Sequence, residues 1–366
     1  MSKKEIVITD YSKVKIPKDF VLIKIGSHNV NLRNTINLDN KIKEIITYIT
    51  NNYKNKTLDI VCLQGLYDAT SLLVLIREFK KYCLKHKLKI YLAPSFDNIE
   101  PGTSLSPNNI VTSKQMLDLS FHGSNSSNGS NSGGSKGIKR KKIIQNIIIS
   151  MHPIISTIYA ELDDRTDMDD VLGMQTVIGA NILIGNNIIS VYNTCLSKDI
   201  RSANIINSDV RLSELDTLMN IINKNKNSIT DEKFKKYNKS DIHLIAGTIN
   251  INEADTDGIS QEYIEFISDR KCIDIFRYLH NDDPGFTTSY TERVNYILIN
   301  LTDDVYDETG KLSESFKEIK SGEQLFNLLF KRYNIYFLDS YVIKNDINTS
   351  LIYYPIECIF IVKNQS

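Results

Sequence analysis

The sequence predicts a four-layer α/β sandwich, in which two mixed β-sheets pack face to face and helices cover their outer faces. Short apolar segments typical of strands occur along the whole 366-residue chain, long helical patterns are few, and no internal repeat is visible. A doubly wound single sheet would instead alternate strands and helices regularly. The length fits one large α/β domain, so we expect a single domain over residues 1–366.

The first hundred residues contain three strand patterns and two helix patterns. "FVLIKIGSHNV" predicts a strand that ends in a polar turn, and "LDIVCLQGL" predicts a buried strand. "LDNKIKEIITYITNNY" spaces its apolar residues three and four apart, which indicates an amphipathic helix. "TSLLVLIREFKKYCLKH" predicts a helix with a basic last turn, and "LKIYLAP" a strand that Pro94 ends.

A low-complexity insertion interrupts this pattern at about residues 121–137. Its tract "HGSNSSNGSNSGGS" contains no apolar side chain to bury, so we expect a flexible loop. A basic segment over residues 136–142 follows, and a solvated loop flank is its simplest interpretation. The alternative is contact with nucleic acid or an acidic protein, since clustered cations bind phosphates without fixed geometry. The cations that would contact an anion are Lys139, Arg140, Lys141 and Lys142.

Strand patterns dominate the second half of the chain. "KIIQNIIISMHPI" predicts a strand, and "TVIGANILIGNNIISVYNTCL" a hairpin that turns through Gly185, Asn186 and Asn187. "SELDTLMNIINKN" predicts a helix with Ser213 as its N-cap. The remaining strand patterns are "HLIAGTININ", "RVNYILINL", "YNIYFLDSYVI" and "LIYYPIECIFIV".

The composition gives no general attraction to nucleic acid or to anionic membranes, because 44 basic and 44 acidic residues balance. The five cysteines are widely spaced without metal-ligand spacing, which favours buried free thiols in a reducing compartment. The N-terminus is too polar for a signal peptide, and no apolar segment is long enough to span a membrane. We therefore expect a soluble, intracellular, cytoplasmic protein. The frequent Ile, Asn and Lys are typical of an AT-rich genome.

Seven short segments, collinear from about residue 21 to residue 362, together resemble the endonuclease/exonuclease/phosphatase superfamily with its deoxyribonuclease-I-like fold. "LIKIGSHNV" resembles the first strand of that family, and "DIVCLQGLY" its D-I-V-x-L-Q-E segment. "IQNIIISMHPI" is similar to G-N-A-I-L-S-x-x-P-I, and "IISVYNTCL" to V-x-N-T-H-L. "LIAGTININ" corresponds to Gly-Asp-x-Asn, "ERVNYILI" to R-x-D-Y-I, and "LIYYPI" to S-D-H-x-P.

The resemblance implies phosphoester hydrolysis with a divalent metal, on nucleic acids, lipids or inositol phosphates. In the family a Glu holds Mg²⁺, and a His/Asp pair activates the attacking water. The chemistry requires such groups, because a hard cation binds anionic oxygen and water needs a base at neutral pH.

This chain lacks the charged machinery at the positions that the resemblance assigns. They are occupied by Gly65 (metal Glu), Cys195 (phosphate-contacting His), Thr248 (Asp of Gly-Asp-x-Asn), Asn295 (Asp of R-x-D-Y), and Ile352 and Tyr353 (the C-terminal Asp and His). The matching residues that remain, which would line a vestigial cleft, are Asn29, Gln64, Asn193, Asn250, Arg293 and Tyr296. We therefore expect no catalytic residue, no metal and no cofactor.

Relocated chemistry is the alternative, and it would again use Mg²⁺. The metal ligands would then come from an acidic loop or from a second carboxylate cluster near the strand that matches Gly-Asp-x-Asn, and His280 would serve as a substitute acid or base. The two clusters are Asp163, Asp164, Asp167, Asp169 and Asp170, and Glu253, Asp255 and Asp257. His28 should point away from Asn29, because neighbouring strand residues face opposite sides. Arg293 could hold an anionic ligand or pair with a loop carboxylate.

The sequence thus predicts a catalytically inactive phosphodiesterase-fold protein that acts as a binding or scaffold module. A divergent divalent-metal-dependent phosphodiesterase or nuclease is the alternative, and a purely structural component of an assembly is a third. The partner is unknown. A protein or nucleic acid could bind through the cleft or through residues 136–142.

Overall fold

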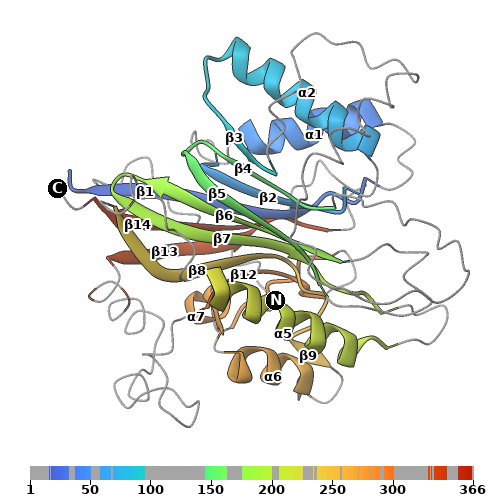
Figure 1. Cartoon of the computed structure of the whole chain (residues 1–366). Coiled ribbons are helices and arrows are strands. Elements are labelled where there is room, and N and C mark those ends of the chain that lie inside the picture. Colours follow the sequence, from blue (N-terminus) through green and yellow to red (C-terminus); the bar gives the residue numbers. More distant parts are fainter. Residues whose placement is uncertain are drawn as a thin grey trace, which may run out of the picture.

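The computed structural model confirms the predicted sandwich of two mixed six-stranded sheets with helices outside them (Figure 1). The described residues are 16, 18–32, 38–50, 58–66, 69–94, 145–162, 175–199, 206–225, 234, 237–255, 258–270, 272–280, 282–288, 292–300, 329, 331, 334–343 and 353–364. The low-complexity insertion, the basic segment and the first acidic cluster lie outside these residues.

The first sheet contains the N-terminal and C-terminal strands side by side. Its order is β13 (Ile335–Val342), β14 (Ile356–Lys363), β1 (Phe20–Asn29), β2 (Ile60–Gln64), β4 (Ile147–Ser150) and β3 (Tyr91–Ala93). All neighbours are antiparallel except β1 and β2, which run parallel. A parallel pair needs a long crossover, and α1 (Leu38–Thr50) lies in it.

The second sheet also has six strands, of which one neighbouring pair is parallel. Its order is β11 (Cys272–Asp274), β12 (Asn295–Asn300), β8 (Asn238–Thr248), β7 (Asn187–Cys195), β6 (Thr176–Ile184) and β5 (Ile154–Glu161). The single parallel pair is β7 and β8, and α5 (Ser208–Asn225) lies in its crossover. A small hairpin of β9 (Ala254–Asp255) and β10 (Gly258–Ile259) precedes α6 (Gln261–Asp269), and α7 (Ile275–Leu279) follows β11.

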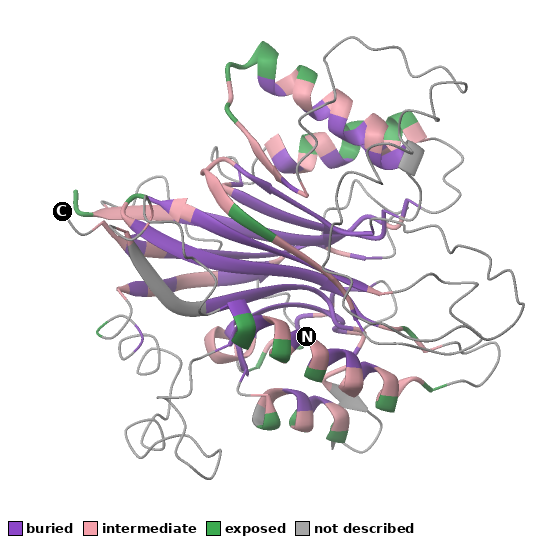
Figure 2. Cartoon of the chain, viewed as in Figure 1, coloured by how far each residue is buried: buried purple, intermediate pink, exposed green. Residues whose placement is uncertain are grey.

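Three apolar clusters hold the four layers together, and purple ribbon marks their buried strands in Figure 2. Between the sheets, Ile25 and Cys62 of the first sheet pack with Val191 and Ala246 of the second. A second cluster lies under α1 and α2 (Ala69–Lys85), and a third under α5 and α6. Each fully buried Ile or Leu contributes about 1.5–3 kcal/mol, so these faces fix the position of the strand ends that carry the candidate site.

The sequence located most of the elements but misplaced several boundaries. "KIIQNIIISMHPI" is split between sheets: β4 ends at Ser150, and β5 begins at Ile154 in the second sheet. The helix expected to begin at Ser213 begins at Ser208, so Ser213 is not its N-cap. The earlier start was missed because Arg211, a charged residue, interrupts the apolar pattern of the helix. Arg211 is nevertheless buried, and it forms ion pairs with Asp199 and Glu262.

Other local expectations are confirmed. The β6–β7 hairpin turns at Gly185 and Asn186, with Gly185 in the left-handed region (φ +58°) that suits glycine. All five cysteines are buried and free. Among the described residues, no helix combines the length and hydropathy needed to cross a bilayer.

Candidate functional site

Five uncharged side chains from both sheets meet where β1, β2, β7 and β8 end and β12 begins. Strand pairing sets them in rows: Asn29 lies beside Gln64 in the first sheet, and Thr248 lies beside Asn295 in the second. Asn193 of β7 is the fifth. We call Asn29, Gln64, Asn193, Thr248 and Asn295 the polar bridge. Every member is at most 3% exposed.

One half of the polar bridge centres on Thr248. Its hydroxyl accepts a hydrogen bond from Asn29 Nδ2 (3.1 Å) and donates to Asn295 Oδ1 (2.8 Å). The Nδ2 atom of Asn295 donates onward to the carbonyl of Tyr354, in the segment before β14. The position that the family resemblance assigns to a catalytic Asp therefore holds a neutral hydroxyl that joins the two sheets.

The other half centres on Gln64 and Asn193. Gln64 Nε2 donates to Asn193 Oδ1 at 2.7 Å. Asn193 Nδ2 in turn lies 2.9 Å from the Leu63 carbonyl and 2.8 Å from the Ile147 carbonyl, both in the first sheet. Because buried amides without partners are costly, these bonds fix the distance between the sheets at this end.

Gly65, at the position that the resemblance assigns to a metal-binding Glu, has no room for a side chain. Its backbone is in the left-handed region (φ +76°), which is strained for any residue with a Cβ. A Cβ built there would overlap Asn29 Oδ1 and would lie 2.8 Å from the Asn31 nitrogen. Asn29 Oδ1 is held in that space by the Asn31 N–H (3.1 Å). The space next to Gly65 is therefore filled by the side-chain amide of Asn29.

Cys195 lies beside Thr248 at the end of β7. Burial, helped by the nearby Glu214 carboxylate, raises the pKa of the Cys195 thiol to about 12 although Lys198 and Thr248 oppose the rise. A thiol with this pKa is protonated and a poor nucleophile at neutral pH. The structure therefore gives Cys195 the environment of a buried small side chain.

Tyr353, at the position that the resemblance assigns to a catalytic His, forms an isolated bridge with Thr288. Its hydroxyl accepts a hydrogen bond from Lys198 Nζ (2.9 Å), and the Lys198 ammonium lies 5.4 Å from its ring centroid. Sequence reasoning did not identify Lys198, because it lies far from Tyr353 in the chain. Ile352 lies outside the described residues.

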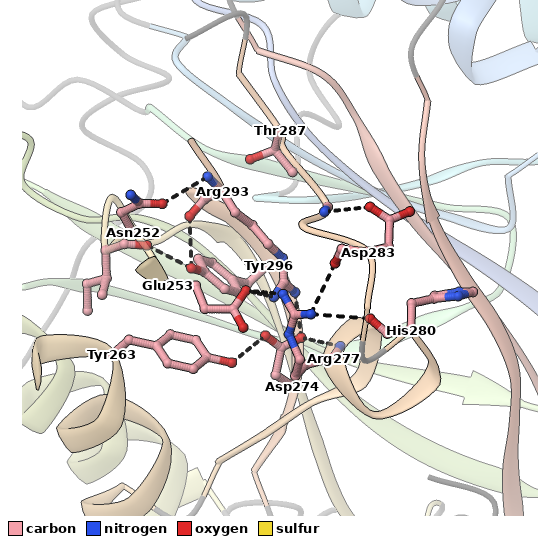
Figure 3. A network of polar contacts seen from close by, with 12 residues as sticks. Asn252, Glu253, Tyr263, Asp274, Arg277, His280, Asp283, Thr287, Arg293 and Tyr296 are labelled. Atoms are coloured by element: carbon pink, nitrogen blue, oxygen red, sulfur yellow. Dashed lines mark hydrogen bonds and ion pairs between the residues drawn. The ribbon is translucent and has the colours of Figure 1, made fainter. Parts of the chain in front are cut away.

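Arg293 is the centre of a separate buried network (Figure 3). Its guanidinium pairs with Asp274 (2.6 Å) and Glu253 (3.1 Å) and stacks on the Phe276 and Tyr296 rings. Burial alone would lower the pKa of Arg293, but the Asp274 carboxylate outweighs it and the net pKa is raised. Of the two roles expected for Arg293, the structure shows pairing with carboxylates.

The other residues of the expected cleft also have structural partners. Tyr296 places its hydroxyl 2.8 Å from both the Ile251 and Arg293 carbonyls. Asn250 has a positive φ of 58° and donates to the Leu196 carbonyl (2.7 Å). Both residues therefore shape the loop between β8 and β9.

The candidates for relocated chemistry are dispersed in the structure. Glu253 is bound by Arg277 and Arg293, while the Asp255 and Asp257 side chains lie outside the described residues. His280 pairs with Asp339 (3.2 Å). Among the described residues, no three His, Cys, Asp or Glu side chains are arranged to hold a metal ion.

His28 points to the opposite face from Asn29, as expected. Its ring lies edge-on to Tyr48 of α1, with centroids 5.2 Å apart, and it is 2% exposed. Burial lowers the pKa of His28 to about 3, with a further contribution from Lys41. His28 is therefore a neutral packing residue.

No protein-family model matches the sequence, and no curated protein matches it. Solved structures do. SmcL is 15% identical, with a TM-score of 0.50 over 93% of this chain and 99% of SmcL. Beta toxin from Staphylococcus aureus is also 15% identical, with a TM-score of 0.50 over 92% of this chain and 99% of the toxin.

An endonuclease/exonuclease/phosphatase family protein from Bacteroides thetaiotaomicron is 9% identical, with a TM-score of 0.50 over 94% of this chain and 98% of its own. The chain has the endonuclease/exonuclease/phosphatase fold. The similarity spans nearly the whole of both chains, as the collinear motifs of this fold predicted. At these identities it shows the fold alone.

Thr287 is the clearest member of this site that sequence reasoning missed. Its Oγ1 accepts hydrogen bonds from the backbone nitrogens of Val294 (2.9 Å) and Asn295 (3.0 Å), which positions the start of β12. A threonine in a polar loop carries no sequence signal for such a role, because Ser and Thr bond to local backbone in many loops.

Proposed function

We propose that this protein is a catalytically inactive form of the endonuclease/exonuclease/phosphatase fold that acts as a binding or scaffold module. The proposal rests on the backbone conformation of Gly65 and on the lack of space around it. A glutamate at this position would need a strained backbone and the space that Asn29 occupies. The packing around Gly65 therefore leaves no space for a carboxylate ligand at this position.

The polar bridge supports the same proposal. Mg²⁺ prefers anionic oxygen ligands in octahedral geometry. The oxygens available here are neutral and already accept hydrogen bonds, Asn29 Oδ1 from the Asn31 N–H and Asn295 Oδ1 from the Thr248 hydroxyl. The described residues at this position therefore do not fit a divalent metal.

The missing proton acceptor is the third support. Loss of a general base alone lowers a rate by about 10²- to 10⁴-fold. The two titratable side chains at the family positions are Cys195, whose pKa is about 12, and Tyr353, whose hydroxyl accepts the bond from Lys198. The Cys195 thiol is therefore protonated near pH 7 and does not act as a base.

Turnover of bis(4-nitrophenyl) phosphate and plasmid DNA, with Mg²⁺, Mn²⁺ or EDTA, tests the proposal. We expect no turnover above a mock purification, and no rise in melting temperature with either metal, because binding to the folded state would stabilise it. EDTA-sensitive turnover that co-purifies with the protein, and that Thr248→Val lowers while Thr248→Ser retains, would overturn the proposal. Turnover lost in Glu253→Gln or His280→Gln would instead support relocated chemistry.

A further inference from the structure

His280 and Asp339 connect the two sheets at one edge of the sandwich. His280 is the C-cap of α7, which follows the edge strand β11 of the second sheet. Asp339 lies in β13, the edge strand of the first sheet, at an irregularity between Phe337 and Asp339. His280 Nε2 lies 3.2 Å from Asp339 Oδ1, and the two side chains are 32% and 17% exposed. The pair is therefore within reach of solvent protons.

Local contacts hold the histidine in place. The Phe276 ring lies 5.0 Å from the His280 ring, and the His280 N–H donates to the Phe276 carbonyl (2.9 Å). Asp339 Oδ1 also accepts the Ser340 N–H (2.9 Å), which fixes the carboxylate toward the imidazole. Both partners are thus oriented by their own elements.

The other charged groups near the pair either form ion pairs of their own or are carboxylates, whose negative charge favours protonated His280. Among the described residues, the charged groups on α7 and on the elements around it are Arg277, which pairs with Glu253; Arg293, which pairs with Asp274; and the carboxylates of Asp282 and Asp283. The other titratable groups there are Tyr278 on α7 and, beside Asp339, Tyr341 and Cys358; burial raises the pKa of all three, which keeps them neutral near pH 7. The hydrogen bond that His280 donates to Asp339, together with the negative charges of Asp339 and Asp283, raises the pKa of His280 above 6.5 although burial opposes the rise.

The segment after His280 leads to the polar bridge. Gly285 passes directly over the Phe276 ring, with φ +58°. Two residues later, Thr287 accepts the N–H groups of Val294 and Asn295, and its carbonyl accepts the Tyr354 N–H (2.7 Å). Thr287, seven positions after His280, thus contacts both Asn295 and Tyr354.

We infer that the His280–Asp339 pair is a pH-sensitive clasp that controls how firmly the 285–288 segment closes against the polar bridge and the Tyr353–Tyr354 segment. In the protonated state, an imidazolium bonded to a carboxylate ties α7 to β13. In the neutral state an ordinary hydrogen bond replaces the charge-assisted one, and the apolar packing of Phe276 near Phe337 stays the same. The inference does not depend on whether the protein is catalytically active.

The direction of the effect follows from linkage. A group whose pKa is raised by folding stabilises the structure fully below its unfolded value of 6.5, and this stabilisation is lost as pH rises through the folded pKa. Charge-assisted hydrogen bonds are stronger than neutral ones by an amount equivalent to about a fivefold change in an equilibrium constant. We therefore expect local opening of the 285–288 segment to increase about fivefold above the folded pKa.

Two measurements on the full chain test the clasp. NMR titration of the imidazole protons gives the pKa of His280, which should exceed 6.5 in the wild type and fall in Asp339→Asn. Amide hydrogen exchange at pH 6 and pH 8.5, corrected for intrinsic rates, reports the opening of residues 285–288 and of Tyr354. We expect the pH-dependent fivefold change in the wild type and its loss in Asp339→Asn.

His86→Phe is the matched control, because His86 is an exposed histidine that stacks on Tyr82 in the outer helix layer. It should keep the wild-type exchange pattern. If Asp339→Asn does not fold, His280→Gln gives the same comparison. A His280 pKa at or below 6.5 in the wild type, or an equal pH dependence of exchange in the wild type and either clasp variant, would overturn the inference.

Discussion

Replacement of Thr248 by valine tests whether the polar bridge is a structural joint between the sheets. Valine keeps the shape of threonine but removes the hydroxyl that bonds to Asn29 and Asn295. One buried donor and one buried acceptor lose their partner, and each unpaired group costs about 1–3 kcal/mol. Since Thr248 is 0% exposed, water cannot replace the hydroxyl without rearrangement. We expect Thr248→Val to lower the free energy of unfolding by about 2–4 kcal/mol.

Thr248→Ser is the matched comparison, because it keeps the hydroxyl and deletes one methyl group. It should cost only about 1 kcal/mol. Urea unfolding of both variants, followed by circular dichroism and compared at equal m-values, gives the difference. A valine variant as stable as the serine variant would show that the Asn29–Thr248–Asn295 bonds contribute nothing to joining the sheets, and the reasoning on the site would fail.

Two further predictions follow from the structure, and a third concerns the basic segment, which lies outside the described residues. Gly65→Ala should destabilise the fold by about 2 kcal/mol in urea unfolding, because the left-handed backbone disfavours a Cβ and the Asn31 nitrogen lies 2.8 Å from it; a change below about 0.5 kcal/mol would contradict this. Burial lowers the pKa of His28 from 6.5 to about 3, so the folded protein favours the neutral imidazole. The free energy of unfolding should therefore be highest above pH 6.5 and about 2 kcal/mol lower at pH 5. His28→Phe should flatten that dependence, and an unchanged slope in acid unfolding would refute it. If residues 139–142 bind nucleic acid, neutralising them should weaken DNA binding and reduce its salt dependence by about 0.9 per lost phosphate contact; a lack of DNA binding by the wild type at low salt would exclude this partner.

The order of elements was accessible from the sequence because it depends on local signals. Period-2 alternation placed His28 and Asn29 on opposite faces of one strand, and Gly185-Asn186 marked a hairpin. The collinear motifs pointed to the fold, which the structure confirms. The helix start at Ser208 was missed for a definite reason: Arg211 is buried by ion pairs with partners from other segments, which no hydropathy pattern reveals.

The sequence by itself predicted the fold and, through the family resemblance, which residues stand at the positions assigned to catalytic groups, since both depend on the order of motifs along the chain. It could not determine what those residues do. That Thr248 bonds to Asn29, that Asn29 fills the space beside Gly65, and that Arg293 pairs with Asp274 are decided by tertiary packing. The reason is physical: hydrogen-bond partners and desolvation depend on distances between residues that are remote in the chain, and only the folded structure sets those distances.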